Sequence, residues 1–91
     1  MALGMLFKPK GMTAAAYDDV IRRLEEAGAG HPPGRMSHAS VIVDGDVWVF
    51  DIWESREQFE KFGATLIPIL RAAGVDPDEP IVGEVHNTIA G

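Results

Sequence analysis

The sequence contains no cysteine among its 91 residues, only one tyrosine and few basic residues. The absence of cysteine excludes disulfides, thiolate metal sites and a cysteine nucleophile, and it is compatible with the cytoplasmic location that we expect. Eight Lys and Arg residues are scattered among fourteen acidic ones, so no basic stripe for nucleic acid is expected. No apolar run approaches the length of a membrane span, and the N-terminal residues do not resemble a signal peptide.

The order of apolar patterns and turn residues predicts one domain over residues 1–91. Residues 2–8 form a short apolar strand. Thr13 then caps a helix that ends at Gly28, and a hairpin follows over about 35–53. Ser55 and Gln58 form a capping box for a second helix, which Pro68 should kink or split. The last strand is predicted over 81–89, so the order is strand, helix, strand, strand, helix, strand.

The segment from Met36 to Trp53 carries the clearest local signal. Asp44-Gly45 separates two runs of β-branched and aromatic residues, which is the pattern of a hairpin with a two-residue turn. Such a turn fixes the register and places His38 opposite Asp51. The same register gives three further pairs: Val43 with Asp46, Ser40 with Val49, and Met36 with Trp53.

Both faces of this hairpin are rich in apolar residues. Alternation places the following residues on one face: Met36, His38, Ser40, Ile42, Val47, Val49, Asp51 and Trp53. The other face is almost purely apolar: Ser37, Ala39, Val41, Val43, Trp48, Phe50 and Ile52. We predict that the helices cover this second face, together with Leu3, Met5 and Phe7 of the first strand and Ile81, Val85 and Ile89 of the last.

The first face would then be left open, although it carries large apolar side chains. Exposed apolar surface is unfavourable by roughly 25 cal/mol per Å² and usually marks an interface. We therefore expect a homodimer in which a second copy stacks its sheet against this face and encloses a semi-polar cavity in each protomer. The element order itself is that of a ferredoxin-like α+β fold, with a four-stranded antiparallel sheet and two helices on one face.

The junction between the hairpin and the second helix carries a family resemblance. Its residues, Asp51-Ile-Trp53-Glu-Ser55-Arg-Glu-Gln-Phe59, are similar to the acid–x–aromatic strand end and Ser-led helix of the dimeric α/β-barrel superfamily, in its antibiotic-biosynthesis-monooxygenase-like group. The segments Gly11-Met-Thr13 and Val85-His86-Asn87 also resemble small members of this group. The resemblance covers nearly the whole chain and implies the fold and the dimer. The superfamily includes oxygenases, isomerases, cyclases, haem proteins and members without activity, so it selects no reaction.

His38 and Asp51 are the strongest catalytic candidates. Directly opposed residues bring their Cβ atoms to about 5 Å, and a carboxylate bonded to one imidazole nitrogen fixes the tautomer of the ring. Such a pair suits a general base that removes a proton next to a carbonyl or from a phenol. An ordinary cross-strand polar pair has the same sequence pattern and stays open as an alternative.

Other residues are candidates because the predicted face brings them near this pair. His86 could donate to a carbonyl or enolate oxygen if the last strand has the assigned parity. Trp53 offers a flat aromatic wall and an indole donor. Four further residues are expected to line the cavity as substrate-binding residues: Ser40, Met36, Val49 and Tyr17.

A metal or cofactor site is not expected. His38, Asp51, Glu84 and His86 share the predicted face, but the sequence contains no H-E-x-x-H or H-x-x-E-H pattern. No glycine-rich loop matches a nucleotide-binding fingerprint. Relatives that hold haem commonly supply an axial histidine from a helix or nearby loop, and neither predicted helix contains one.

Two hypotheses follow from these residues. The first is a small homodimeric enzyme without an organic cofactor that binds an aromatic or polyketide-like molecule between the sheet and the helices. It would abstract a proton with His38–Asp51, as a monooxygenase, cyclase or isomerase, while His86 and Trp53 orient the substrate. The second is a non-catalytic dimeric module for ligand binding or interaction. A cavity of a few hundred Å³ next to His38 and Asp51 would favour an enzyme or a binder.

Overall fold

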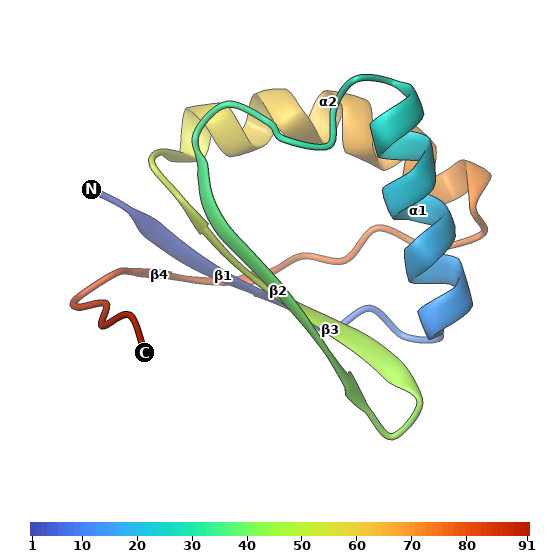
Figure 1. Cartoon of the computed structure of the whole chain (residues 1–91), viewed down its shortest axis with the longest axis horizontal. Coiled ribbons are helices and arrows are strands. Elements are labelled where there is room, and N and C mark those ends of the chain that lie inside the picture. Colours follow the sequence, from blue (N-terminus) through green and yellow to red (C-terminus); the bar gives the residue numbers. More distant parts are fainter.

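The computed structural model describes all 91 residues. The elements follow in the order β1 (Leu3–Phe7), α1 (Ala14–Glu26), β2 (Arg35–Val43), β3 (Asp46–Trp53), α2 (Arg56–Ala72) and β4 (Ile81–Glu84). The strands form one antiparallel sheet in the order β2-β3-β1-β4, and both helices lie on the same side of it (Figure 1). This arrangement confirms the ferredoxin-like α+β fold. Neither helix combines the length and the apolar character that crossing a membrane requires.

Both helices begin where the sequence predicts. The Thr13 hydroxyl accepts a hydrogen bond from the Ala16 backbone amide at 3.2 Å, and the Ser55 hydroxyl accepts one from the Gln58 amide at 3.3 Å. The predicted split at Pro68 does not occur, because α2 is helical from Arg56 to Ala72. Proline removes one backbone bond, while Leu66 and Leu70 pack against the core on either side of it and hold the helix together.

The hairpin has the predicted turn, since Asp44 and Gly45 both have positive φ angles, of 50° and 87°. The predicted pairs of His38 with Asp51 and of Ser40 with Val49 are confirmed. The pairing of Met36 with Trp53 is wrong. A β-bulge between Arg35 and Ser37 makes Arg35 the partner of Trp53, and Met36 is left 60% exposed.

The predicted cover of the hairpin is also wrong, because the helices lie over the opposite face. The face toward the helices carries Val47, Val49, Asp51 and Trp53, all buried. The almost purely apolar face is open instead, with Val41 56% exposed and Phe50 45% exposed. On β1 the prediction holds. Leu3, Met5 and Phe7 pair with the buried residues Trp53, Asp51 and Val49 and share their face.

The last strand differs from its prediction in both length and parity. It ends at Glu84, which pairs with Leu3 at the start of β1, so the ladder ends there. Val82 pairs with Met5 and faces the helices, whereas Ile81 lies on the open face and is 63% exposed. The residues after β4 run away from the sheet (Figure 1), and Ile89 is 84% exposed rather than covered by a helix.

The core fills the layer between sheet and helices. Its most completely buried side chains are Met5, Val47 and Trp53. The Trp53 ring meets Phe59 edge-on at a centroid distance of 5.5 Å and lies at the same distance from Phe62. Since Phe59 and Phe62 come from α2, these contacts fix the second helix over β3 and define one wall of the space described next.

Candidate active site

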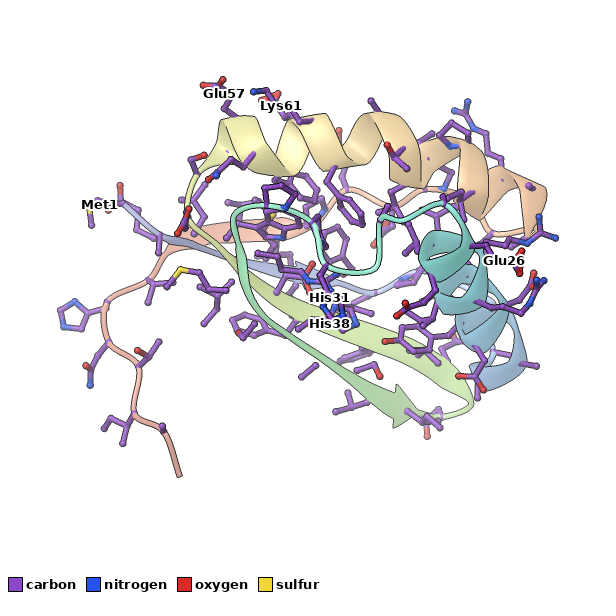
Figure 2. All side chains as sticks on the ribbon, turned by 45° about the horizontal axis from the view of Figure 1, so that its top comes forward. Met1, Glu26, His31, His38, Glu57 and Lys61 are labelled. Carbon is purple, nitrogen blue, oxygen red and sulfur yellow. The ribbon has the colours of Figure 1, made fainter.

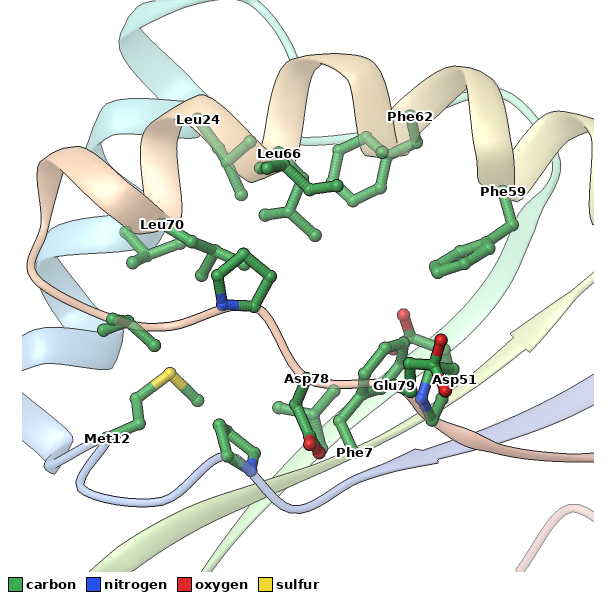
Figure 3. Close-up of a pocket in the computed structure, with 18 of the residues that line it drawn as sticks. Phe7, Met12, Leu24, Asp51, Phe59, Phe62, Leu66, Leu70, Asp78 and Glu79 are labelled. Atoms are coloured by element: carbon green, nitrogen blue, oxygen red, sulfur yellow. The ribbon is translucent and has the colours of Figure 1, made fainter.

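A pocket of about 950 Å³ lies between the sheet and the helices, where the first hypothesis placed the ligand. The predicted open face implied a cavity between two stacked sheets, and the pocket does not lie there. Figure 3 shows Phe59, Phe62, Leu66 and Leu70 projecting from α2 toward the pocket, with Phe7 and Asp51 on the sheet side. The volume is at the upper end of the range for small-molecule sites, and most of the lining is apolar.

The floor of the pocket contains a chain of hydrogen bonds that links four side chains. His38 Nδ1 lies 2.6 Å from Asp51 Oδ1, and the Trp53 indole Nε1–H donates to Asp51 Oδ2 at 3.1 Å. On the other side of the imidazole, Nε2 lies 2.6 Å from the Tyr17 hydroxyl. The four side chains come from three elements: Tyr17 from α1, His38 from β2, and Asp51 and Trp53 from β3.

The chemistry of the donors assigns the protons in this chain. Indole N–H only donates, so Asp51 Oδ2 is an acceptor, and its other oxygen can accept from the imidazole at Nδ1. With Nδ1 carrying the proton, neutral His38 accepts the Tyr17 hydroxyl at Nε2. The order of donation therefore runs from Tyr17 to His38 to Asp51, and Asp51 is 5% exposed. A buried carboxylate with two donors and no orphaned polar atom is a stable arrangement.

Four of the predicted site residues meet at this place. Tyr17, His38, Val49 and Asp51 all line the pocket. Trp53 is fully buried behind them and does not line the pocket, so it reaches the site only through its bond to Asp51. The predicted aromatic wall is supplied by Phe7, Phe59 and Phe62 instead.

Three other predicted residues lie elsewhere. Ser40 is exposed near the hairpin turn, and Met36 is the exposed bulge residue; neither lines the pocket. His86 follows the end of β4 and is exposed, next to Leu6 and Phe50 of the open face. His86 lies there because the helices cover the other face of the sheet and because β4 ends at Glu84, before it reaches His86. His38 and His86 therefore lie at different places and cannot share a metal ion. The structure contains no cluster of three or more His, Cys, Asp or Glu residues suited to a metal ion.

Arg35 is a pocket residue that the sequence did not reveal. The bulge turns it toward the helices, where its guanidinium donates to the Gly30 carbonyl at 2.9 Å. Its guanidinium carbon lies 6.0 Å from the centroid of the Phe62 ring. A bulge has no reliable sequence signature. A hairpin register counted without a bulge therefore does not predict that Arg35 lies in the pocket.

The rim of the pocket carries an excess of negative charge. Four exposed carboxylates line it, against two guanidinium groups at Arg35 and Arg56; the carboxylates belong to Glu60, Asp76, Asp78 and Glu79. Asp78 and Glu79 lie at the side of the pocket near Phe7 (Figure 3), and Asp78 also accepts the Lys8 backbone amide at 3.0 Å. Together with the net charge of −6, this rim disfavours anionic ligands.

The helix that supplies Tyr17 is supported by ion pairs on its outer side. The Arg23 guanidinium donates to Asp19 at 2.9 Å, and Arg22 bonds both Asp19 and Glu26. Hydrogen bonds from Arg22 and then Arg23 lower the pKa of Asp19 below its usual value. The same ion pairs raise the pKa of Arg22.

Solved structures of antibiotic-biosynthesis-monooxygenase-like proteins match the fold of this chain over nearly its whole length. SnoaB from Streptomyces nogalater, a cofactor-independent oxygenase, has 17% identity and a TM-score of 0.64, covering 99% of this chain and 96% of its own. A protein from Chloroflexus aurantiacus assigned as an antibiotic biosynthesis monooxygenase has 19% identity and a TM-score of 0.62, covering 99% and 100%.

A third structure, a variant of MhuD solved with two manganese protoporphyrin IX molecules per active site, has 19% identity and a TM-score of 0.57 and covers 100% of both chains. No family model and no curated protein matches the sequence. At these identities the comparisons establish the fold, and they confirm the fold resemblance drawn from the sequence.

The residues of this pocket do not fit haem. His38 is the only histidine that lines it, and both of its ring nitrogens already have hydrogen-bond partners, so neither is free to bind iron. The acidic rim would also repel the propionate groups of a porphyrin. No step of the chemistry below is therefore assigned to haem.

Proposed function

We propose that this protein is a small enzyme that binds a neutral aromatic or polyketide-like molecule in the pocket and removes a proton from it without an organic cofactor. The observation that carries the proposal is the His38–Asp51 pair, bonded at 2.6 Å and facing an apolar pocket of about 950 Å³. A base on the floor of a mainly apolar pocket can act on a proton whose loss is difficult in water.

The first step of the reaction is deprotonation next to a carbonyl or of a phenol. The His38 imidazole is the group that gains a proton in the net reaction. The electron pair stays on the substrate as an enolate or phenolate. Asp51 holds the ring in the tautomer whose Nε2 is the basic nitrogen and balances the positive charge that develops on the imidazole. The fold likeness to SnoaB, a cofactor-independent oxygenase, supports this type of chemistry. Oxygenation, cyclisation and isomerisation can all begin in this way.

The walls of the pocket define the shape of the ligand. Phe7 and Phe59 lie 5.9 Å apart between ring centroids, and Phe62 adds a third ring, so flat apolar molecules can stack there. The excess of carboxylates on the rim favours neutral molecules over carboxylates. A ligand of two or three fused rings with a carbonyl or hydroxyl group suits both features.

The protein is further proposed to act as a cytoplasmic homodimer that buries the open face of the sheet. This face exposes Val41, Phe50 and Ile81, and neither helix covers it. Such a patch favours association because its burial removes apolar surface from water. The exposed residues differ from those that the sequence predicted, but a second copy stacked on the sheet remains the proposed partner.

Proton exchange tests the proposed function directly. β-Tetralone, a neutral bicyclic ketone with acidic protons between its carbonyl and its ring, is incubated with the protein in deuterium oxide, and proton NMR follows the loss of that signal. We expect the wild type to accelerate exchange over buffer and His38→Gln to reduce the acceleration by about 10²-fold or more. Ser40→Ala, on the same strand but outside the pocket, should keep the wild-type rate. Exchange at the buffer rate, or equal rates for wild type and His38→Gln, would overturn the proposal.

A further inference from the structure

Tyr17 is the one tyrosine of the chain, and it occupies the end of the hydrogen-bond chain that is nearest to α1. Its hydroxyl lies 2.6 Å from His38 Nε2, and the two rings are parallel within 6° at a centroid distance of 6.1 Å. Figure 2 shows His38 on the side of the hairpin that faces α1. The phenol is therefore positioned against the base and not merely near it.

The contacts of His38 leave it no free nitrogen for a substrate. Nδ1 is bonded to Asp51 and Nε2 to Tyr17. A neutral imidazole has one donor and one acceptor, and both are used here. The phenol oxygen, in contrast, donates its single proton to His38 and keeps acceptor capacity of its own. Asp51 is 5% exposed, whereas Tyr17 lines the pocket and is only half-buried, so the phenol oxygen is the acceptor of the hydrogen-bonded chain that a ligand can reach.

Resting on the proposed function, we infer that Tyr17 is the catalytic base that touches the substrate, while His38 and Asp51 act through it. The substrate C–H or O–H bond breaks, its proton moves to Tyr17 Oη, and its electron pair remains on the substrate. In the same step the phenol proton moves to His38 Nε2. The product state is an enolate or phenolate beside a neutral tyrosine, with an imidazolium paired to the Asp51 carboxylate, so protons and charge balance.

The surroundings of Tyr17 suit this role. The side chain is half-buried on α1 and packs against the buried cluster of Met12, Val47, Val49 and Val75. The Asp19 ion pairs follow on the same helix. The bond to His38 thus holds the oxygen in a pocket that the aromatic side chains of α2 also line.

This assignment narrows the substrate class. Proton transfer is efficient when donor and acceptor have similar affinities for the proton. Because the proton finally resides on the imidazole, the relay suits carbon and oxygen acids that are strengthened by conjugation. These are phenols, naphthols and ketones whose α-carbon also adjoins a carbonyl or an aromatic ring, rather than isolated ketones or unactivated C–H bonds.

The single tyrosine allows a test that changes the acidity of the phenol with little change in shape. Wild type, Tyr17→Phe and a protein with fluorotyrosine at position 17 are compared with β-tetralone in the exchange assay, across a range of pH. We expect Tyr17→Phe to lose about 10²-fold or more of the exchange rate. Because fluorination makes the phenol more acidic, the pH profile of the fluorotyrosine protein should move to lower pH. Fluorine NMR of the same protein reports ligand contact at position 17 independently of the rate.

The outcomes separate this inference from the proposed function. If Tyr17→Phe exchanges as fast as wild type while His38→Gln does not, His38 meets the substrate itself and only the inference is overturned. An unchanged pH profile for the fluorotyrosine protein, or a fluorine signal that does not respond when β-tetralone binds, also overturns it. If no protein exceeds the buffer rate, the inference fails together with the proposed function.

Discussion

Tyr17 Oη lies 2.6 Å from His38 Nε2, and this contact joins α1 to the hairpin directly above the buried carboxylate of Asp51. Because this bond occupies His38 Nε2, it leaves Tyr17 Oη as the atom that a ligand can contact. It also connects the position of the helix to the protonation of the imidazole. The predictions below test the parts of this arrangement one at a time.

Asp51→Asn should reverse the tautomer of His38. Asparagine can still accept the Trp53 indole N–H with its oxygen, and its amide nitrogen then donates to His38 Nδ1. The imidazole proton must move to Nε2, which can no longer accept the Tyr17 hydroxyl. Nitrogen NMR of labelled histidine distinguishes the two tautomers, with the exposed His86 as an internal reference. An unchanged Nδ1–H form in the variant would contradict the proton assignment.

Trp53→Phe should destabilise the protein although the new ring keeps most of the packing. The substitution removes the donor to Asp51 Oδ2, and a buried acceptor left without its partner costs about 1–3 kcal/mol. Loss of the larger ring adds to this cost. Urea unfolding followed by circular dichroism measures the change. A free energy of unfolding equal to that of the wild type would show that the indole bond is not part of the folded state.

Phe50→Glu should dissociate the proposed dimer. Phe50 is 45% exposed at the centre of the open face, and a buried unpaired carboxylate in an interface is strongly unfavourable. Thr65→Glu, exposed on α2 and outside the pocket, is the matched control. Size-exclusion chromatography with light scattering should give a dimer for wild type and control and a monomer for Phe50→Glu. A wild-type mass of one chain at micromolar concentration would remove the dimer from the account.

The acidic rim should discriminate between ligands of equal shape. Calorimetry of β-naphthol and of a hydroxynaphthoic acid is expected to give at least about tenfold weaker binding for the carboxylate. The difference should shrink in the Asp78→Asn, Glu79→Gln double variant and at high salt, because exposed charges are screened. Equal affinities in the wild type would contradict a role for these carboxylates in selectivity.

The ion pairs on α1 should make a small, pH-dependent contribution to stability. The arginines lower the folded-state pKa of Asp19, so its contribution is complete above the usual value of 3.8 and is lost as the pH falls through the lowered value. Stability differences between wild type and Asp19→Asn should therefore narrow in acid below that range. Thermal unfolding at a series of acidic pH values measures this, and a difference independent of pH would contradict the cause given.

The fold could be predicted from the sequence because its signals are local. Thr13 and Ser55 cap the helices, and Asp44-Gly45 forces the turn that places His38 opposite Asp51. The covered side could not be predicted, since both hairpin faces are apolar. A rule that places polar residues outward fails for Asp51, because His38 and Trp53 satisfy its oxygens inside the protein.

The positions of the other site residues depend on features that the alternation of side chains along a strand does not reveal. The bulge at Met36 moves Arg35 into the pocket, and the early end of β4 leaves His86 on the other side of the sheet. The bond between Tyr17 and His38 joins residues from different elements, and its formation depends on the angle of α1 over the sheet. That angle is a property of core packing, which short motifs do not determine.

The central claim is that the ligand binds between the sheet and the helices, against the Tyr17–His38–Asp51 chain. Amide chemical-shift mapping with β-tetralone locates the ligand most directly. The account predicts that the shifted signals cluster at residues of the pocket, such as Tyr17, His38 and Phe62, and that Phe50 and Ile81 stay unchanged. Shifts confined to the open face around Phe50 would contradict it.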